Sequence, residues 1–260
     1  MKKVLFSILV MPLLLTFAMP VLSADIGGAE IDITADFTYA TKYMWHGYDI
    51  FDGHGAYMPS IDFGYQGFNV GFWAAYPSSS GYEDLTEFDY YISYGRSFFE
   101  DQVYAVDASV GYTYFDFPKT SGFDASEVFL SVAFPSLIPI GPSTLVPSYT
   151  MYYDFEGFDS DQLTNIEGFY NTFGLSYSLP IKPFLKDQEE QSLDFMFDIT
   201  HDDGVYGAQS DWSYSTIGVS TTYDYKGFYF TPGINYQFNL NDIVNTEDDF
   251  YATFSVGYAF

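Results

Sequence analysis

Apolar and polar residues alternate with a period of two along most of the chain. In the last segment, "FYATFSVGYAF", every second position from Phe250 to Phe260 is aromatic or small and apolar, and the positions between them are mostly small or polar. This period is typical of a β-strand with two unlike faces. The pattern predicts about twelve strands, at residues 31–45, 56–65, 68–76, 87–95, 103–114, 125–134, 144–154, 167–179, 192–201, 213–225, 228–238 and 249–260.

The predicted connections fall into two groups. The shorter ones lie at 65–68, 96–102, 135–143, 180–191 and 225–228. The longer ones are acidic and contain Gly and Ser, and they lie at 46–55, 77–86, 116–124, 155–166, 202–212 and 239–248. Because short and long connections alternate, we predict an all-β, up-and-down antiparallel barrel with both termini at the short-turn end.

Residues 1–23 have the features of a secretory signal peptide. Two lysines precede the apolar run "VLFSILVMPLLLTFAM", and small residues follow near Ser23 and Ala24. The run is short, Pro12 interrupts it and Pro20 follows it, which favours a cleaved signal peptide over an uncleaved N-terminal anchor. We therefore predict an exported protein with one domain at residues 24–260.

The amino-acid composition argues against several classes of protein. The net charge of −27 argues against nucleic-acid binding, and the aromatic content of 22% argues against a disordered chain. The chain has no Cys, so a disulfide framework is excluded. Alternation by itself also fits a soluble sandwich or lipocalin-like barrel, in which the apolar face points into the core. Aromatic residues near the strand ends and the scarcity of Lys on the polar face favour a transmembrane barrel.

The polar faces predict an acidic interior. Twelve strands spaced by about 4.8 Å and tilted by about 40° form a backbone cylinder about 24 Å across. Carboxylates in a dry core are costly, so we expect a wet lumen. The predicted lining residues are Asp32, Asp36, Lys42, Asp62, Glu87, Asp89, Asp107, Glu127, Asp194 and Asp198.

Two functions fit this interior. A water-filled lumen with fixed negative charge concentrates cations, which predicts an outer-membrane channel for passive diffusion of small polar solutes, cationic or neutral. The alternative is a non-conducting structural or adhesive barrel that acts through its acidic outer loops. In that case the acids pair locally with Tyr hydroxyls and Lys42, and inward aromatics fill the lumen. The expected inward aromatics are Trp73, Tyr91, Phe129, Tyr152, Tyr170 and Tyr214.

We predict no enzymatic activity, no cofactor and no metal site. The three histidines are His46, His54 and His201, and none has the His-x-Ser arrangement of membrane-embedded lipid hydrolases. His201 beside Asp202 resembles an Asp–His pair, but polar loops produce such neighbours by chance. The acidic loops lack the spacing of an EF-hand, although they can collect Ca²⁺ or Mg²⁺ and bridge lipopolysaccharide phosphates.

The N-terminal third resembles a known family. Tyr43 and Gly47 flank a turn, "IDFGYQGFNVGFW" follows at 61–73, and "EFDYYISYG" follows at 87–95. This order is similar to that of the TorF-type porins, also called the Gcw_chp family, in which Arg is usual at the position of His46. The resemblance implies an outer-membrane barrel with a loosely assigned porin function. The terminal Phe260 likewise resembles the signal that the outer-membrane assembly machinery reads. The expected partners are therefore this machinery, outer-membrane lipid and lipopolysaccharide, and small solutes.

Overall fold

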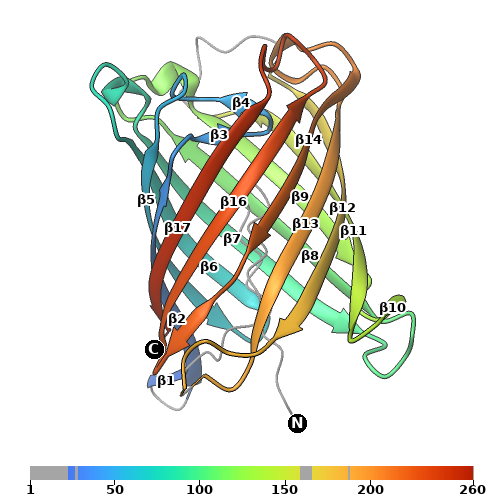
Figure 1. Cartoon of the computed structure of the whole chain (residues 1–260). Helices are drawn as coiled ribbons and strands as arrows, with labels where there is room; N and C mark the ends of the chain where they lie inside the picture. Colours follow the sequence, from blue (N-terminus) through green and yellow to red (C-terminus); the bar gives the residue numbers. More distant parts are fainter. Residues whose placement is uncertain (1–22, 27–28, 159–165, 187, 260) are drawn as a thin grey trace.

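The structure is a closed barrel of twelve long strands (Figure 1). This computed structural model describes residues 23–26, 29–158, 166–186 and 188–259. The barrel strands are β2 (Ala29–Ala40), β5 (Ala56–Tyr65), β6 (Phe68–Pro77), β7 (Glu87–Phe98), β8 (Val106–Asp116), β9 (Ala125–Ala133), β11 (Ser143–Glu156), β12 (Gly168–Ile181), β13 (Gln191–Asp202), β14 (Asp211–Ser220), β16 (Phe228–Asn239) and β17 (Asp249–Ala259).

Each barrel strand pairs antiparallel with the next, and β17 closes the barrel against β2, with Val256 opposite Phe37. Closure gives every strand two hydrogen-bonded neighbours and leaves no open sheet edge. The predicted up-and-down topology and its alternating connections are confirmed. Short strands extend three hairpins at the short-turn end, namely β1 (Ser23–Ile26), β10 (Ile138–Ile140) and β15 (Tyr223–Tyr225). The long-loop end carries the 3₁₀ turns Glu83–Leu85, Ser121–Phe123 and Val205–Gly207.

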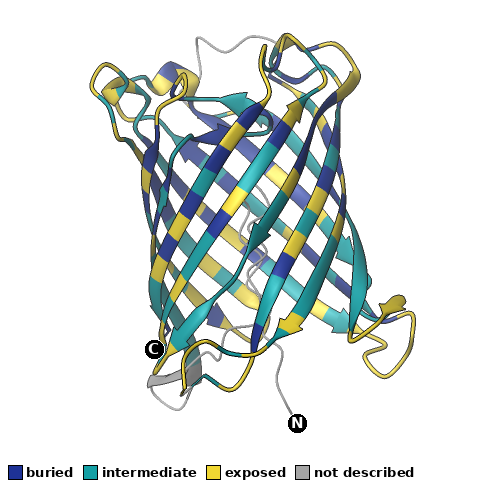
Figure 2. Ribbon diagram, viewed as in Figure 1, coloured by how far each residue is buried: buried dark blue, intermediate teal, exposed yellow. Residues whose placement is uncertain are grey.

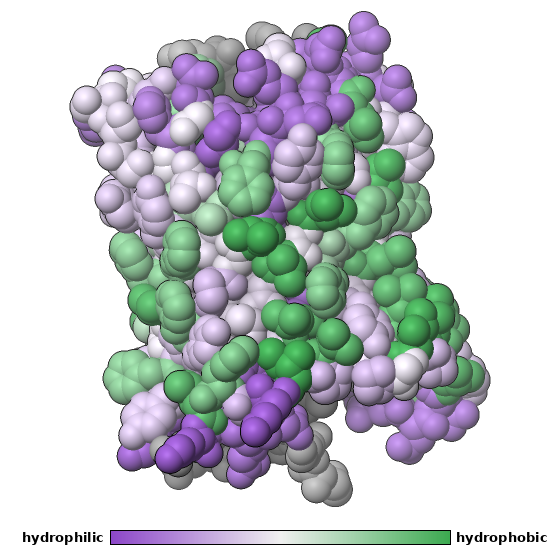
Figure 3. Space-filling model, in the orientation of Figure 1, coloured by the Kyte–Doolittle hydropathy of each residue, from purple (hydrophilic) through white to green (hydrophobic). Residues whose placement is uncertain are grey.

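The apolar face of the strands points outward. On β17, Phe250, Phe254 and Val256 are exposed, whereas Tyr251 and Ser255 are buried. Figure 2 shows the same alternation of buried and exposed residues along the strands, and Figure 3 shows an apolar belt between hydrophilic ends. A lipocalin-like soluble barrel needs the opposite arrangement, so the outward apolar face excludes that alternative.

Some predictions concern residues that the structure does not describe. Nearly all of the predicted signal peptide, residues 1–22, and the terminal Phe260 lie outside the described residues. Cleavage of the signal peptide and recognition of Phe260 therefore stay predictions. Within the described residues, no helix has the length and apolar character needed to cross a membrane.

Candidate functional site: the mouth of the barrel

The first long loop, residues 41–55, folds into the barrel instead of standing above it. It contains two short strands, β3 (Met44–Trp45) and β4 (Tyr48–Asp49), which cross the long-loop end in Figure 1. Trp45 pairs with Tyr48 across a two-residue turn made of His46 and Gly47. Both turn residues have positive φ, +43° and +93°, which is the type I′ geometry that Gly adopts readily and His tolerates. We call residues 43–51 the inserted hairpin.

Long-range packing holds the inserted hairpin in place. Tyr43 and Phe51 are almost fully buried in a cluster with Trp73 of the barrel wall. The Tyr43 hydroxyl donates to Glu87 Oε2 at 2.8 Å, and Gln237 Nε2 donates to the Gly47 carbonyl at 2.8 Å. These contacts come from three different strands, so the hairpin is joined to several sides of the lumen.

The inserted hairpin corrects one prediction. The strand expected at 31–45 ends at Ala40. Alternation over that range predicts Tyr43 and Trp45 on the outward apolar face with Phe37, but both lie inside the barrel. Trp45 contacts the rings of Phe115, Tyr170 and Tyr206 there. Alternation cannot predict this departure from the barrel wall, because aromatic side chains are stabilised by burial both in lipid and in a packed lumen.

The turn of the inserted hairpin presents His46 to the barrel wall. The His46 ring stacks on Tyr170 of β12, with ring centroids 4.1 Å apart and planes 6° from parallel. His46 Nε2 lies 2.9 Å from Glu127 Oε2 of β9. One donor atom from each of His46, Glu127 and Asp154 lies within 4.8 Å of the others. We call these three residues, together with Tyr48, Tyr170 and Asp202, the mouth cluster.

The mouth cluster holds several polar atoms without hydrogen-bond partners. Glu127 and Asp154 are directly opposite each other on β9 and β11, an arrangement that is unfavourable for two like charges. Both carboxylate oxygens of Asp154 are buried and unpartnered, as is Glu127 Oε1. The Tyr48 and Tyr170 hydroxyls and Asp202 Oδ2 are also unpartnered. No Lys or Arg forms an ion pair with these acids within the described part of the chain.

Burial also controls the protonation of the two cluster residues that come from the loop. Burial lowers the pKa of His46, against the opposing effect of the Asp154 and Asp202 charges. Burial raises the pKa of the Tyr48 hydroxyl, and the charges of Asp202 and Asp154 add to this effect. His46 is therefore held towards the neutral imidazole, which leaves the facing carboxylates without a fixed cation.

A second buried acid pair lies beside the mouth cluster on β7. Glu87 accepts the hydrogen bond from Tyr43. Asp89, which is 1% exposed, has no hydroxyl, amide or cationic partner among the described residues, and its neighbour is the acid Glu87. Acidic side chains therefore lie on the inner wall from β7, through β9 and β11, to β13.

A contrasting acid pair lies on β2 and β5, and we call Asp36 and Asp62 the wall pair. Asp36 accepts hydrogen bonds from Thr38 Oγ1 at 2.8 Å and from the Tyr229 hydroxyl at 2.9 Å. Asp62 accepts from Asn69 Nδ2 at 2.9 Å and from the Tyr91 hydroxyl at 2.7 Å. Both acids therefore have local donors inside the barrel, as the non-conducting alternative expects.

Nine of the ten predicted lining residues lie at inward positions of barrel strands. The buried ones are Glu87, Asp89, Asp107, Glu127, Asp194 and Asp198, and the half-buried ones are Asp32, Asp36 and Asp62. Lys42 lies instead in the first loop and forms ion pairs with Asp249 and Asp49. The predicted inward aromatics also lie on the inner face. Their role in lining a conducting pore stays a prediction.

Sequence reasoning missed Asp154 and Asp202, and it did not count His46 among the lining residues. Asp154 follows Tyr152 by two residues and therefore shares its inward face, so extending the alternation to the end of the strand would have found it. Asp202 was placed in a loop but is the last residue of β13. No local pattern indicates that His46 faces the lumen.

The other residues considered as catalytic candidates lie apart from one another in the structure. His54 lies beside Tyr82, and His201 lies beside Trp212. Asp202 Oδ1 accepts hydrogen bonds from the backbone N–H groups of Gly204 and Val205, so this oxygen holds a loop.

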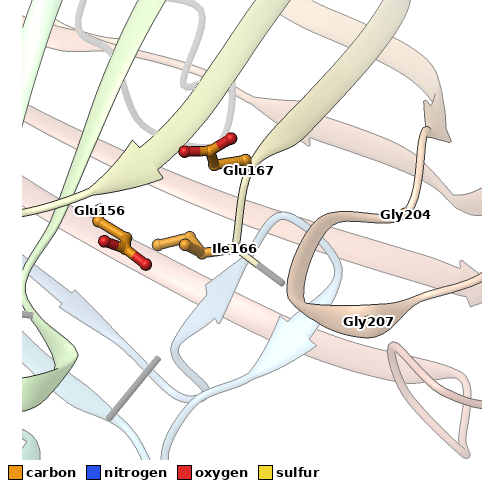
Figure 4. Close-up of a pocket in the computed structure, with 5 residues that line it drawn as sticks. All are labelled: Glu156, Ile166, Glu167, Gly204 and Gly207. Carbon is orange, nitrogen blue, oxygen red and sulfur yellow. The ribbon is translucent and has the colours of Figure 1, made fainter. Parts of the chain in front are cut away.

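A cavity of about 460 Å³ opens at the long-loop end above the mouth cluster. It is lined by Glu156, Ile166, Glu167, Gly204 and Gly207 (Figure 4). Glu156 is exposed and lies two residues beyond Asp154 on the same face of β11. Inward carboxylates thus continue from the buried cluster towards the outside.

The barrel is similar to solved porin structures. It aligns with the KdgM porin over 87% of this chain and 99% of that one, with a TM-score of 0.50 and 10% identity. The NanC porin aligns over 88% and 98%, with a TM-score of 0.50 and 9% identity. At such identities the similarity shows the fold alone. No known family profile and no curated protein matches the sequence, so membership of the TorF-type family stays a prediction.

Proposed function

We propose that this protein is an outer-membrane channel for passive diffusion of small polar solutes that are cationic or neutral. The observation that carries the proposal is the contrast between the two faces of one closed sheet. The outward face is an exposed apolar belt, and the inward face is polar and rich in carboxylates. A bilayer stabilises the first face, and water stabilises the second. The porins that share this fold support the same assignment.

The charge of the lumen supports a preference for cations. The inward residues of the barrel strands include many acids, while Arg96 of β7 is exposed and Lys42 is paired with Asp249. Fixed negative charge in a narrow aqueous path raises the local concentration of cations and repels anions. The inserted hairpin narrows this path at the mouth, so the proposed solutes are small.

Single-channel recording of the refolded mature protein in a planar bilayer tests the proposal. We expect discrete conductance steps and, in a salt gradient, a reversal potential that indicates cation preference. Neutralising Asp32, Asp36 and Asp107 together with Asn is expected to move the reversal potential towards zero. The matched control is Asp84→Asn, because the Asp84 side chain is 79% exposed on an outer loop. A folded barrel without steps would overturn the proposal.

One observation favours the second candidate, a non-conducting structural or adhesive barrel that acts through its acidic outer loops. The inserted hairpin is packed against the wall through Tyr43 and Phe51, which are 2% and 0% exposed. Liposome swelling with small sugars and amino acids separates the two functions. Swelling supports the channel, whereas its absence from vesicles that contain folded protein supports the structural barrel.

A further inference from the structure

The mouth cluster combines donor atoms of two kinds in a small volume. An imidazole nitrogen comes from His46, and carboxylate oxygens come from Glu127 and Asp154, all within 4.8 Å of one another. Donors that share one ion at about 2.1 Å each lie roughly 3 to 4.2 Å apart. The His46 Nε2 to Glu127 Oε2 distance of 2.9 Å falls at the lower end of this range. Among the described residues no hydroxyl, amide, Lys or Arg donates to the Asp154 carboxylate, and its hydrogen-bonding neighbour is another carboxyl, that of Glu127, so a rotation of the Asp154 side chain can complete the set.

A second observation points independently to a bound group. The Tyr170 hydroxyl is fully buried and has no hydrogen-bond partner, and it lies within electrostatic range of Asp154 and Asp202. Buried polar groups are almost always partnered in native proteins, because an unpaired one costs about 1 to 3 kcal/mol. Here several such groups, on Tyr48, Tyr170, Asp154 and Asp202, lie within electrostatic range of one another, and each offers an oxygen that can face a cation. The simplest partner that satisfies them together carries positive charge.

We propose that His46, Glu127 and Asp154 bind a divalent transition-metal ion at the mouth of the barrel. Mg²⁺ and Ca²⁺ prefer sites built entirely from oxygen, whereas an imidazole with carboxylates suits ions such as Zn²⁺, Fe²⁺ or Co²⁺. The ion offsets the repulsion between the facing carboxylates of β9 and β11. It also joins the inserted hairpin to the wall. The exposed Glu156 lies two residues beyond Asp154 on the same face of β11, at the end of the barrel from which an ion would enter.

The proposal predicts binding of one Zn²⁺ per chain in excess Mg²⁺. The protein is the untagged mature chain refolded in detergent, and the measurement is isothermal titration calorimetry. Excess Mg²⁺ occupies the acidic loops, so it separates this site from general attraction to a chain of net charge −27. Since the experiment needs no bilayer, its result is independent of whether the barrel conducts.

Substitutions locate the bound ion. We expect His46→Gln and Asp154→Asn each to weaken Zn²⁺ binding by at least the roughly tenfold to hundredfold that loss of an outer-shell partner costs. The matched control is His54→Gln, in the same loop but exposed, which leaves binding unchanged. Asp154→Asn keeps the shape of the side chain and removes a like-charge contact, so it tests the site even if His46→Gln disturbs the hairpin. The heat-modifiable shift of each variant on a gel confirms that it is folded.

A fluorescence measurement locates the ion without substitution of any of the three proposed metal ligands. The Trp45 and His46 rings lie 4.7 Å apart, so Co²⁺ at this site quenches Trp45 fluorescence. Loss of this quenching in Trp45→Phe supports the placement. The proposal is overturned if Mg²⁺ removes all Zn²⁺ binding, if the ligand variants bind as the parent protein does, or if Glu127 and Asp154 share a proton and the folded protein binds no ion.

Discussion

The wall pair and the mouth cluster contain the same kind of residue at the same kind of position, but their surroundings differ. Asp36 and Asp62 are inward acids that receive hydrogen bonds from neighbouring Tyr, Thr and Asn side chains. Asp154 is an inward acid to which no hydroxyl, amide, Lys or Arg donates among the described residues, and it faces another acid, Glu127. Partnered acids stabilise the inner wall. Unpartnered acids require a cation, a proton or water, and they are the better candidates for function.

The difference has a structural origin in the inserted hairpin. On the side of β2 and β5, tyrosines on the wall strands themselves supply the donors. On the side of β9 to β13, the inserted hairpin covers the acids and contributes one imidazole but no Lys or Arg. Covering the acids excludes much of the water that would otherwise solvate them. Three predictions test this contrast, from the largest expected effect to the smallest.

The largest effect is expected for Gly47→Val, which acts on the hairpin itself. Gly47 has a φ of +93°, and a Cβ there would lie 2.6 Å from Tyr214 Cδ1 and 2.8 Å from Val244 Cγ1. Backbone strain of about 1 to 2 kcal/mol and overpacking of about 1 to 3 kcal/mol together predict a loss of about 3 kcal/mol in the free energy of unfolding. Urea unfolding in lipid vesicles, followed by Trp fluorescence, measures it.

Gly53→Val is the matched control for this variant. Gly53 lies in the same loop at a φ of +80°, but no heavy atom lies within 4 Å of an added Cβ. Gly53→Val should therefore lower the free energy of unfolding only by the cost of backbone strain, about 1 to 2 kcal/mol. Equal losses in the two variants would mean that the hairpin does not sit against Tyr214 in solution.

Effects of intermediate size are expected for Asp62→Asn and Asp154→Asn. In the presence of a chelator, the two substitutions should change the free energy of unfolding in opposite directions. Asp62→Asn replaces charge-assisted hydrogen bonds from Tyr91 and Asn69 with neutral ones, so we expect a loss of about 1 kcal/mol. Asp154→Asn removes a charge that faces Glu127 and supplies an amide donor, so we expect a gain of about 1 kcal/mol. The midpoint of urea unfolding measures both. Destabilisation by Asp154→Asn would show that this acid already has a partner without metal.

The smallest effect is expected for Lys42→Met at the base of the hairpin. The Lys42 ammonium donates to Asp249, and this hydrogen bond raises the pKa of Lys42 above its ordinary value of 10.5. A raised pKa in the folded state means that the stabilisation is fully present below 10.5 and is lost as pH rises through the folded pKa. Because Lys42 is partly exposed, we expect less than about 1 kcal/mol at neutral pH.

The pH dependence of this pair has its own control. Lys119 pairs with Asp84 at 3.8 Å on the surface, with both side chains more than half exposed. Lys119→Met should therefore leave unfolding unchanged from neutral to alkaline pH. A difference between the parent protein and Lys42→Met that persists at high pH would contradict the assigned ion pair.

The sequence by itself determined the barrel. The period of two predicted the strands, their number, the two kinds of connection and the inward position of acids such as Glu127 and Asp198, because a strand between lipid and a polar lumen must alternate at each residue. A shift of the strand register by one residue would turn these carboxylates towards the lipid. The alternating pattern therefore strongly constrains the register.

Only the tertiary structure decided where the first long loop lies and which acids have partners. Tyr43, Trp45 and His46 continue an alternating stretch, yet they leave the wall after Ala40 and enter the lumen. Their positions depend on contacts with Trp73, Glu127 and Tyr170, which lie 30 to 125 residues further along the chain. A local pattern reports which face of a strand is apolar. It carries no information on which distant side chains close around a loop, and the mouth cluster is built from those distant side chains.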